Sequence, residues 1–264
     1  MARVSVSVGV GNAYTATGAA WQHGPARIYD ELAEVLVAAS PITLANRVVL
    51  DVGAGTGAAS RAIARAGGHP VAVDLALGML AVDRVRRPPA TVGDGRHLPV
   101  ASHTCGAVVA AFSYNHVPDP HLALVEAARV VIPGGAVAAS SYAADDDHPV
   151  KAAVDAAAAA AGWRPEPWLA DLRAGSIPVL ATVEGAAAVA ERAGLAAHTR
   201  VIEVPFPHLT GQDLVAWRLG MASLAPFVAS LPFARRHALE ADALDRLGDP
   251  PMLVRRIVVL TATT

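Results

Sequence analysis

One acid and three regularly spaced glycines are the residues of this sequence whose types and spacing most clearly suggest chemistry. Asp51 is followed by Gly53, Gly55 and Gly57. Glycine accepts positive φ and has no Cβ to block a ligand, so this segment can bring bare backbone close to a nucleoside. A helix-compatible stretch, 58–66, comes next, and the unpaired amides of its first turn add hydrogen-bond donors. The pattern therefore predicts a site for an adenosine-type ligand.

A second acid indicates that the ligand contains a ribose, but it does not decide which cofactor is bound. Asp74 ends the next apolar segment, 17 residues after Gly57, where a carboxylate can accept hydrogen bonds from both ribose hydroxyls. Nicotinamide-binding proteins usually carry G-x-G-x-x-G, whereas here the spacing is G-x-G-x-G with Ala58 and Ala59 after it. A nicotinamide oxidoreductase stays open as an alternative on these residues alone.

The elements that must position these residues follow from the apolar pattern. The run 48–52, rich in Val and Leu and bounded by Gly, indicates a buried parallel strand. The glycines then lie at its carboxyl end, where doubly wound folds bind ligands. Strands alternate with helices, which predicts a parallel sheet with right-handed crossovers. Strands are expected near 47–52, 70–74, 90–93, 106–111 and 135–140, and helices near 28–39, 58–67, 76–86 and 119–130.

Three later motifs extend the pattern. They are Asp94-Gly95 followed by Leu98-Pro99, the segment 113–120, and the segment 126–135, which ends in Pro133-Gly134-Gly135. With the glycine run they span residues 47–140, and over this stretch the chain resembles the class I S-adenosylmethionine-dependent methyltransferases. Within that class it is similar to the small-molecule group with a ubiquinone/menaquinone-methylase-like domain.

The resemblance implies an α/β fold and a set of cofactor contacts. The fold is a Rossmann-like, doubly wound, seven-stranded, mostly parallel sheet, with strand seven (near 252–262) antiparallel between strand five and strand six (near 196–204). The cofactor is S-adenosyl-L-methionine. The implied cofactor-binding residues are Asp51, Gly53, Ala54, Gly55, Gly57, Asp74, Leu75, Met79, Asp94, Gly95, Arg96, Phe112 and Ser113.

The organisation is expected to be a single methyltransferase domain, 1–264, with helical cap insertions. No Pro/Gly/Ser linker divides the chain, and its length suffices for one sizeable core. The expected parts are N-terminal lid helices (1–46), a cofactor-binding core (47–140) and cap insertions (141–181 and 205–250). The caps are expected to hold helices at 150–161, 210–221 and 234–247 and a loop with Trp163 and Trp168, and a helix at 182–193 lies between them.

The activity implied by the resemblance is methyl transfer to a small organic acceptor by in-line displacement. The sulfonium is already activated, so the protein must mainly orient the acceptor and exclude water. A general base helps only where the acceptor loses a proton, and His116 is the candidate, although it could simply order its loop. The caps hold most aromatic residues, which predicts an apolar, lidded pocket. The candidate substrate residues are Tyr14, Trp21, Tyr29, His116, Tyr142 and Trp217.

Two alternatives stay open. The same fold and cofactor can serve a non-methylating enzyme of the pericyclase type, or a non-catalytic cofactor-binding protein. The sequence does not encode the acceptor, the methylated atom (O, N or C) or the oligomeric state.

Charge and composition exclude some partners. Twenty-one Lys and Arg against 23 Asp and Glu give a net charge of −2, so no strong field attracts nucleic acid or an anionic membrane. The pairs Arg86-Arg87, Arg235-Arg236 and Arg255-Arg256 are expected on solvated faces. No segment approaches the roughly 20 apolar residues of a membrane span. One cysteine, Cys105, fits a reducing compartment. A cytoplasmic protein is expected.

Two further patterns receive structural interpretations. Asp145-Asp146-Asp147 precedes a helix, where acids are favourable, so no metal site is predicted. Asp249-Pro250-Pro251 is expected to form a turn that enters the last strand.

Overall fold

A seven-stranded sheet forms the centre of the protein. The computed structural model describes the backbone of residues 2–264 and the side chains of residues 9–264. The strand order is β3-β2-β1-β4-β5-β7-β6, parallel except for β7, which runs antiparallel to both neighbours. The predicted fold class is thereby confirmed. The strands are β1 (Val48–Val52), β2 (His69–Asp74), β3 (Ala90–Val92), β4 (Cys105–Ala111), β5 (Val131–Tyr142), β6 (Ala197–Phe206) and β7 (Leu253–Thr263).

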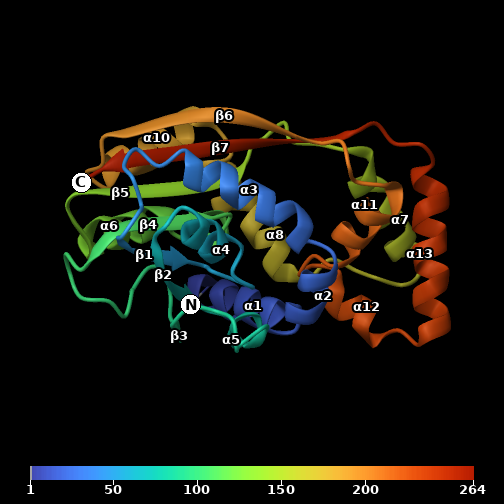
Figure 1. Ribbon diagram of the computed structural model, residues 1–264. Coiled ribbons are helices and arrows are strands. Elements are labelled where there is room, and N and C mark those ends of the chain that lie inside the picture. The colour runs from blue at the N-terminus through green and yellow to red at the C-terminus, as the bar shows by residue number, and fades with distance from the viewer. Residues whose placement is uncertain (1) are drawn as a thin grey trace.

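Helices cover both faces of the sheet. On one face lie α3 (Ala26–Ala38) and α4 (Ala58–Arg65), and on the other α6 (Pro120–Val130) and α10 (Val183–Arg192) (Figure 1). Alternate strand residues supply the two cores. Val49 packs with Leu32 and Ile63 on the first face, whereas Leu50 packs with Leu124 and Val189 on the second. Both faces are buried, which is why the central strands are continuous apolar runs rather than alternating ones.

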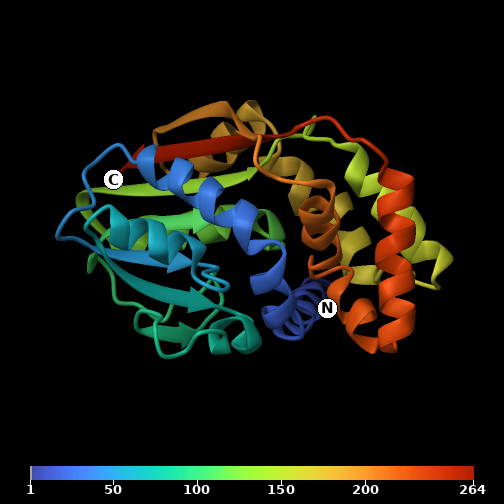
Figure 2. The ribbon, with the colours of Figure 1, turned by 45° about the vertical axis from the view of Figure 1, so that its right-hand side comes forward.

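The remaining helices gather beyond the carboxyl ends of the parallel strands. In Figure 2 the arrowheads of these strands point toward them. They are α1 (Ala2–Thr15), α2 (Gly18–His23), α7 (Pro149–Ala160), α8 (Pro167–Ala174), α9 (Ser176–Leu180), α11 (Gly211–Leu219), α12 (Ala225–Ser230) and α13 (Phe233–Leu247). Two short elements follow strands at the same edge: α5 (Leu77–Ala81) comes after β2, and the 3-10 turn η1 (Tyr114–His116) comes after β4. The edge of the sheet where ligands bind in such folds is therefore covered by helices from both ends of the chain.

The lid formed by α1 and α2 is held by close backbone contact. A Cβ on Gly78 of α5 would lie 1.9 Å from the carbonyl oxygen of Thr15, so only glycine allows α1 to end there. The ring of Trp21 in α2 packs on Tyr29 of α3, with ring centroids 4.7 Å apart. The lid therefore rests on α5 and α3 on either side of the ligand edge.

Three expected elements differ from the structure. The helix expected at 76–86 ends at Ala81, because Val82 is extended and Asp83 takes φ 49°. The loop expected around Trp168 contains α8 and α9, since a proline at the first helical position starts α8 without loss of a hydrogen bond. The strand expected at 135–140 runs from Val131 to Tyr142 and follows α6 directly.

The expected place of Asp249-Pro250-Pro251 before the last strand agrees with the structure. Cys105 is buried and begins β4. Asp249 to Pro251 precede β7, which begins at Leu253. No helix in the described part of the chain is long and apolar enough to cross a membrane.

Candidate active site

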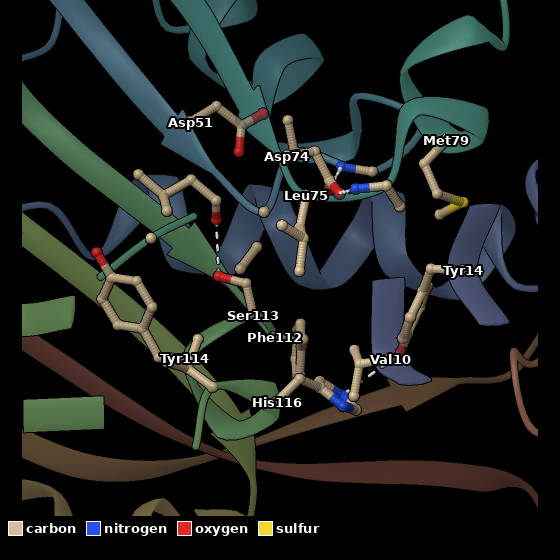
Figure 3. A pocket seen from close by; sticks show the side chains of 18 of the residues that line it. Val10, Tyr14, Asp51, Asp74, Leu75, Met79, Phe112, Ser113, Tyr114 and His116 are labelled. Carbon is tan, nitrogen blue, oxygen red and sulfur yellow. Dashed lines mark hydrogen bonds between the residues drawn. The ribbon is translucent and has the colours of Figure 1, made fainter. Parts of the chain in front are cut away.

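One pocket lies at the carboxyl edge of the sheet, under the lid (Figure 3). The loops after β1, β2, β3 and β4 form its floor and walls, and α1, α2 and α3 close it from above. Its empty space is about 1110 Å³, which includes solvent at its open side. The predicted residues among its lining are Tyr14, Trp21, Tyr29, Asp51, Gly53, Ala54, Gly55, Asp74, Leu75, Met79, Asp94, Gly95, Arg96, Phe112, Ser113 and His116.

The glycine run joins two loops as well as lining the pocket. Gly53 has φ +71°, and a Cβ there would lie 2.2 Å from the Cβ of Ser113. The Ser113 hydroxyl donates to the carbonyl of Val52 at 2.7 Å. The missing Cβ at Gly53 thus makes room for the loop after β4, whereas the sequence suggested that it makes room for ligand. Gly57 does not line the pocket; it precedes α4 with φ +91° and completes the turn.

Asp74 is held in a fixed orientation at the end of β2. Its two carboxylate oxygens accept hydrogen bonds from the backbone N–H of Gly55 and of Ala76, both at 2.7 Å. Burial raises the pKa of Asp74, and the two amide hydrogen bonds oppose that rise. A carboxylate oriented by backbone amides and facing the pocket can accept further hydrogen bonds from a ligand diol.

Asp51 is a buried carboxyl in the same wall. Burial raises its pKa to about 6, against the hydrogen bond that Ser60 donates at 2.6 Å. Its second oxygen, Oδ1, and the hydroxyl of Thr56 have no hydrogen-bond partner among the described residues. Both residues line the pocket. A ligand that carries a cationic or N–H group would satisfy them and would favour the ionised form of Asp51.

The loop after β3 places Asp94 in the pocket, paired with Arg96 of the same loop. Arg96 donates from Nη2 and Nε to the Asp94 carboxylate, at 2.6 and 3.1 Å. Burial would raise the pKa of Asp94, but the hydrogen bonds from Arg96 outweigh it, so the pKa lies below its usual range. Asp94 is therefore an anion that can accept a hydrogen bond from an exocyclic amine.

The lid end of the pocket is aromatic. His116 lies in η1, and its Nε2 is 3.5 Å from the hydroxyl of Tyr14 in α1. Burial lowers the pKa of His116 to about 4 and raises that of Tyr14, so both are neutral near pH 7. Phe112 directly follows β4 with φ 54°, an uncommon conformation for a bulky residue, and its ring meets Tyr29 edge-on at 5.3 Å between centroids.

Two candidate substrate residues lie outside the pocket lining. Tyr142 packs on the far side of Phe112, with ring centroids 4.6 Å apart. Trp217 of α11 lies further out, and the guanidinium of Arg255 is between the two rings, 3.9 Å from the Tyr142 centroid and 4.7 Å from that of Trp217. The expected solvated position of Arg255 is wrong: the residue is 1% exposed.

The sequence interpretation missed some residues of the site. Val10 of α1 and Thr56 of the glycine loop line the pocket. A signal for Arg255 existed, because it alternates in phase with Leu253 and Ile257 in a strand that is covered on both faces. An arginine in that phase must be buried.

The acidic triplet forms ion pairs. Asp146 contacts Arg255 and Lys151, at 2.7 and 3.1 Å, and Asp145 contacts Arg256 at 3.1 Å. Within residues 9–264, no three or more His, Cys, Asp or Glu side chains gather in a way that could hold a metal ion.

Comparison with known proteins identifies the central part of the chain. Residues 50–139 match the family described as "Methyltransferase domain". The demethylmenaquinone methyltransferase of Streptomyces griseus is 36% identical over 129 residues, which cover 48% of this chain and 54% of that protein. That of Renibacterium salmoninarum is 40% identical over 124 residues, covering 46% and 51%. The chain thus spans about half the length of these curated relatives.

Solved structures extend the likeness of fold to most of the chain. The YcgJ protein of Bacillus subtilis superposes with a TM-score of 0.56 at 16% identity, covering 89% of this chain and 98% of its own. The geranyl diphosphate C-methyltransferase of Streptomyces coelicolor gives 0.52 at 16% identity, covering 90% and 80%. The methyltransferase domain, the strand order and these structures agree. The chain therefore contains, over residues 50–139, a methyltransferase domain of the class I S-adenosylmethionine-dependent type, and S-adenosylmethionine is the cofactor of that domain.

Proposed function

We propose that this protein transfers a methyl group from S-adenosylmethionine to a small organic acceptor, mainly by proximity and orientation. One observation carries the proposal. A single pocket runs from the acids Asp51, Asp74 and Asp94 to the aromatic residues Tyr14 and Trp21 under the lid. A polar end and an apolar, covered end are what a nucleoside donor and an organic acceptor require in one site.

The residues of the polar end fit the cofactor. In this proposal Asp74 accepts from the ribose hydroxyls and Asp94 from the adenine amine, while the unpartnered Asp51 Oδ1 faces the charged amino-acid end. The bound cofactor supplies a methyl group activated by the sulfonium charge. We also propose the division into a cofactor-binding core, 47–140, and caps at 1–46, 141–181 and 205–250 that shape the acceptor end.

Methyl transfer in this pocket depends on the alignment of the acceptor with the donor and on the exclusion of water. The lid residues Tyr14 and Trp21 are packed ring to ring, 5.8 Å apart, and cover the aromatic end. Exclusion of water removes the competing nucleophile, and a fixed acceptor converts a bimolecular step into one within the complex. Quinone acceptors of the demethylmenaquinone methyltransferases are planar and apolar, which such a pocket suits.

His116 fits the role of a late proton acceptor. With a pKa of about 4, it cannot deprotonate a free phenol of pKa near 10: the gap of about six units is roughly 8 kcal/mol. The proton of a hydroxyl becomes strongly acidic only while the oxygen gains its methyl group. A neutral His116, with its Nε2 near Tyr14, can take the proton at that point.

The cofactor is tested by binding. S-adenosylmethionine should raise the midpoint of thermal unfolding, whereas NAD should not, because only a ligand of the native state stabilises it. A shift with NAD alone would overturn the proposal. Incubation with radiolabelled cofactor and cell extract should then release S-adenosylhomocysteine. A protein that binds the cofactor without releasing that product would be a pericyclase-type enzyme or a non-catalytic binder.

The role of His116 is tested by substitution. We expect His116→Ala to lower turnover by about 100-fold, in the range for loss of a general base, while cofactor affinity changes little. His198→Ala is the matched control, because His198 is exposed on β6. Near-normal turnover of His116→Ala would leave His116 as a residue that orders its loop.

A further inference from the structure

Arg255 is a buried cation at the ligand edge of the sheet. It is the third residue of β7, and because β7 runs antiparallel to β5, its first residues lie beside the carboxyl end of that strand. Its side chain is 2% exposed, and Nη2 lies 2.7 Å from Asp146 Oδ2. The rings of Tyr142 and Trp217 cover its two sides. We refer to Arg255, Tyr142 and Trp217 as the Arg255 cluster.

The cluster contains hydrogen-bond donors without acceptors. Nε and Nη1 of Arg255 and Nε1 of Trp217 are buried and have no hydrogen-bond partner among the described residues, and the hydroxyl of Tyr142, which lies close to Tyr29 and Arg255, makes no hydrogen bond of good geometry there. Buried polar groups are nearly always paired, since each unpaired one destabilises a fold. Trp163, which packs in the same core, follows the rule and donates to the carbonyl of Ser223 at 3.0 Å.

The nearby carboxylates do not satisfy these donors. Asp146 binds Arg255 through one nitrogen and is shared with Lys151 at 3.1 Å. Asp155 is engaged by Arg218, at 2.7 and 2.8 Å. One buried carboxylate therefore serves two cations, and the guanidinium keeps two nitrogens available for another anion.

The cluster adjoins the acceptor end of the pocket. The Tyr142 ring lies 4.6 Å from Phe112 and 6.1 Å from Tyr29, both of which line the pocket. One layer of aromatic rings separates the guanidinium from the pocket space. Aromatic side chains can change rotamer to admit a ligand, and rings are suitable surfaces for an aromatic acceptor.

We infer that the Arg255 cluster binds an anionic oxygen of the acceptor, a carboxylate, while Phe112 and Tyr29 hold the acceptor's ring. The inference rests on the proposed function and names its substrate class: aromatic or other planar carboxylic acids. A carboxylate accepts from the guanidinium, the indole and the phenol together, which satisfies every donor of the cluster. A neutral amide of the same shape brings its own N–H donors and leaves some of them unpaired.

Matched pairs of acid and amide test this recognition. The probes are benzoate with benzamide and 2-naphthoate with 2-naphthamide, titrated calorimetrically into the full chain saturated with S-adenosylhomocysteine. At least one acid should bind about tenfold or more tightly than its amide, as expected for charge-assisted hydrogen bonds. If no acid binds better than its amide, or if neither binds, the inference is overturned.

Conservative variants assign the preference to the cluster. Trp217→Phe and Tyr142→Phe each remove one unpartnered donor and keep a ring beside Arg255. Each should weaken binding of the acid by roughly three- to tenfold and leave the amide unchanged, and the double variant should lower the acid preference further, to the part that the Arg255 guanidinium supplies alone. Trp163→Phe is the control: it removes an indole N–H that already has a partner, so it should lower the unfolding midpoint and keep the preference for the acid.

The outcomes separate this inference from the proposed function. An acid preference that is undiminished in the Trp217→Phe/Tyr142→Phe double variant would overturn the role of the cluster. An acid preference that the double variant diminishes, in a protein that never releases S-adenosylhomocysteine, would support the cluster and contradict methyl transfer.

Discussion

The two ends of the pocket are built in different ways. At the cofactor end, neighbouring loops hold one another through backbone atoms: Gly55 and Ala76 donate to Asp74, and Ser113 donates to Val52. Beside the end that we propose for the acceptor, and outside the pocket lining, side chains from β5, α11 and β7 meet, and Arg255 and Trp217 keep free donors. The first end is fixed before a ligand arrives, whereas in our proposal the second is completed by one. A cofactor common to many enzymes and an acceptor particular to one of them require this difference.

The largest effect is expected from a substitution that disrupts the contact between the two loops of the cofactor end. Gly53→Ala places a Cβ about where Ser113 already lies and forces alanine into φ +71°. We expect a loss of roughly 3–4 kcal/mol of unfolding free energy, from strain and overpacking together, measured by urea denaturation. Gly134→Ala is the control, with φ +75° and open space around the added Cβ, and should lose only about 1 kcal/mol. Equal losses would show that φ alone matters at Gly53.

The next effect concerns the buried cation of the acceptor end. Arg255→Met should cost about 3 kcal/mol of unfolding free energy, because it removes one of the two cations that pair with the buried Asp146 and leaves Lys151 as the other. Arg246→Met removes an exposed pair with Asp242 and should cost no more than about 0.5 kcal/mol. Thermal shift with S-adenosylmethionine should be the same for Arg255→Met and wild type, since the cofactor end is separate. A lost shift would show that the two ends depend on each other.

The cofactor end also differs in its pH dependence, because Asp51 in its wall changes the stability of the protein with pH. Its folded-state pKa of about 6 lies above the ordinary value of 3.8, so the folded protein holds this proton more tightly than the unfolded chain. Asp51 therefore lowers stability above pH 6 and ceases to do so as pH falls toward 4. About two units correspond to roughly 3 kcal/mol. The stability of Asp51→Asn minus that of wild type should fall by about this amount between pH 7 and pH 4 in denaturant titrations, and a constant difference would contradict the raised pKa.

The smallest effect tests the support of Trp217. Thr210 caps α11: its hydroxyl accepts from the N–H of Asp213, whose side chain accepts from the N–H of Thr210. Thr210→Ala should lower stability by about 1 kcal/mol, and it should weaken acceptor binding more than cofactor binding. Thr182→Ala, the equivalent cap of α10 on the far face of the sheet, should lower stability similarly and leave acceptor binding unchanged. Identical effects on binding would remove the special role of α11.

The same difference explains what could be predicted from the sequence. The cofactor end is formed by short contiguous motifs, such as Asp51 to Gly57, because backbone turns need particular residues at fixed spacing. The fold followed from these motifs and from the alternation of strands and helices. The cluster at Arg255 joins residues 38 to 113 positions apart, whose types (Arg, Tyr and Trp) are unremarkable one by one. Their meeting depends on the packing of β7 and α11, which no local pattern records.

The early end of the helix expected at 76–86 has a similar cause. Residues 82–87 have few apolar side chains to bury, yet Arg87 reaches back to the carbonyls of Leu80 and Gly55. The Arg87 side chain thus ties this segment to the glycine loop through tertiary hydrogen bonds. Propensity alone could not favour this choice, because it considers only neighbouring residues.

The insertion of β7 between β5 and β6 has a consequence for the order of assembly. β6, residues 197–206, forms its ladder with β7 alone, and β7 is translated 46 residues after β6 ends. During synthesis on a ribosome the first five strands can pair while the backbone N–H and C=O groups on both edges of β6 are still without partner strands. A nascent chain will therefore hold a folded nucleoside cradle well before it holds a finished sheet, and the exposed β6 is the segment that a chaperone would need to shield during that interval.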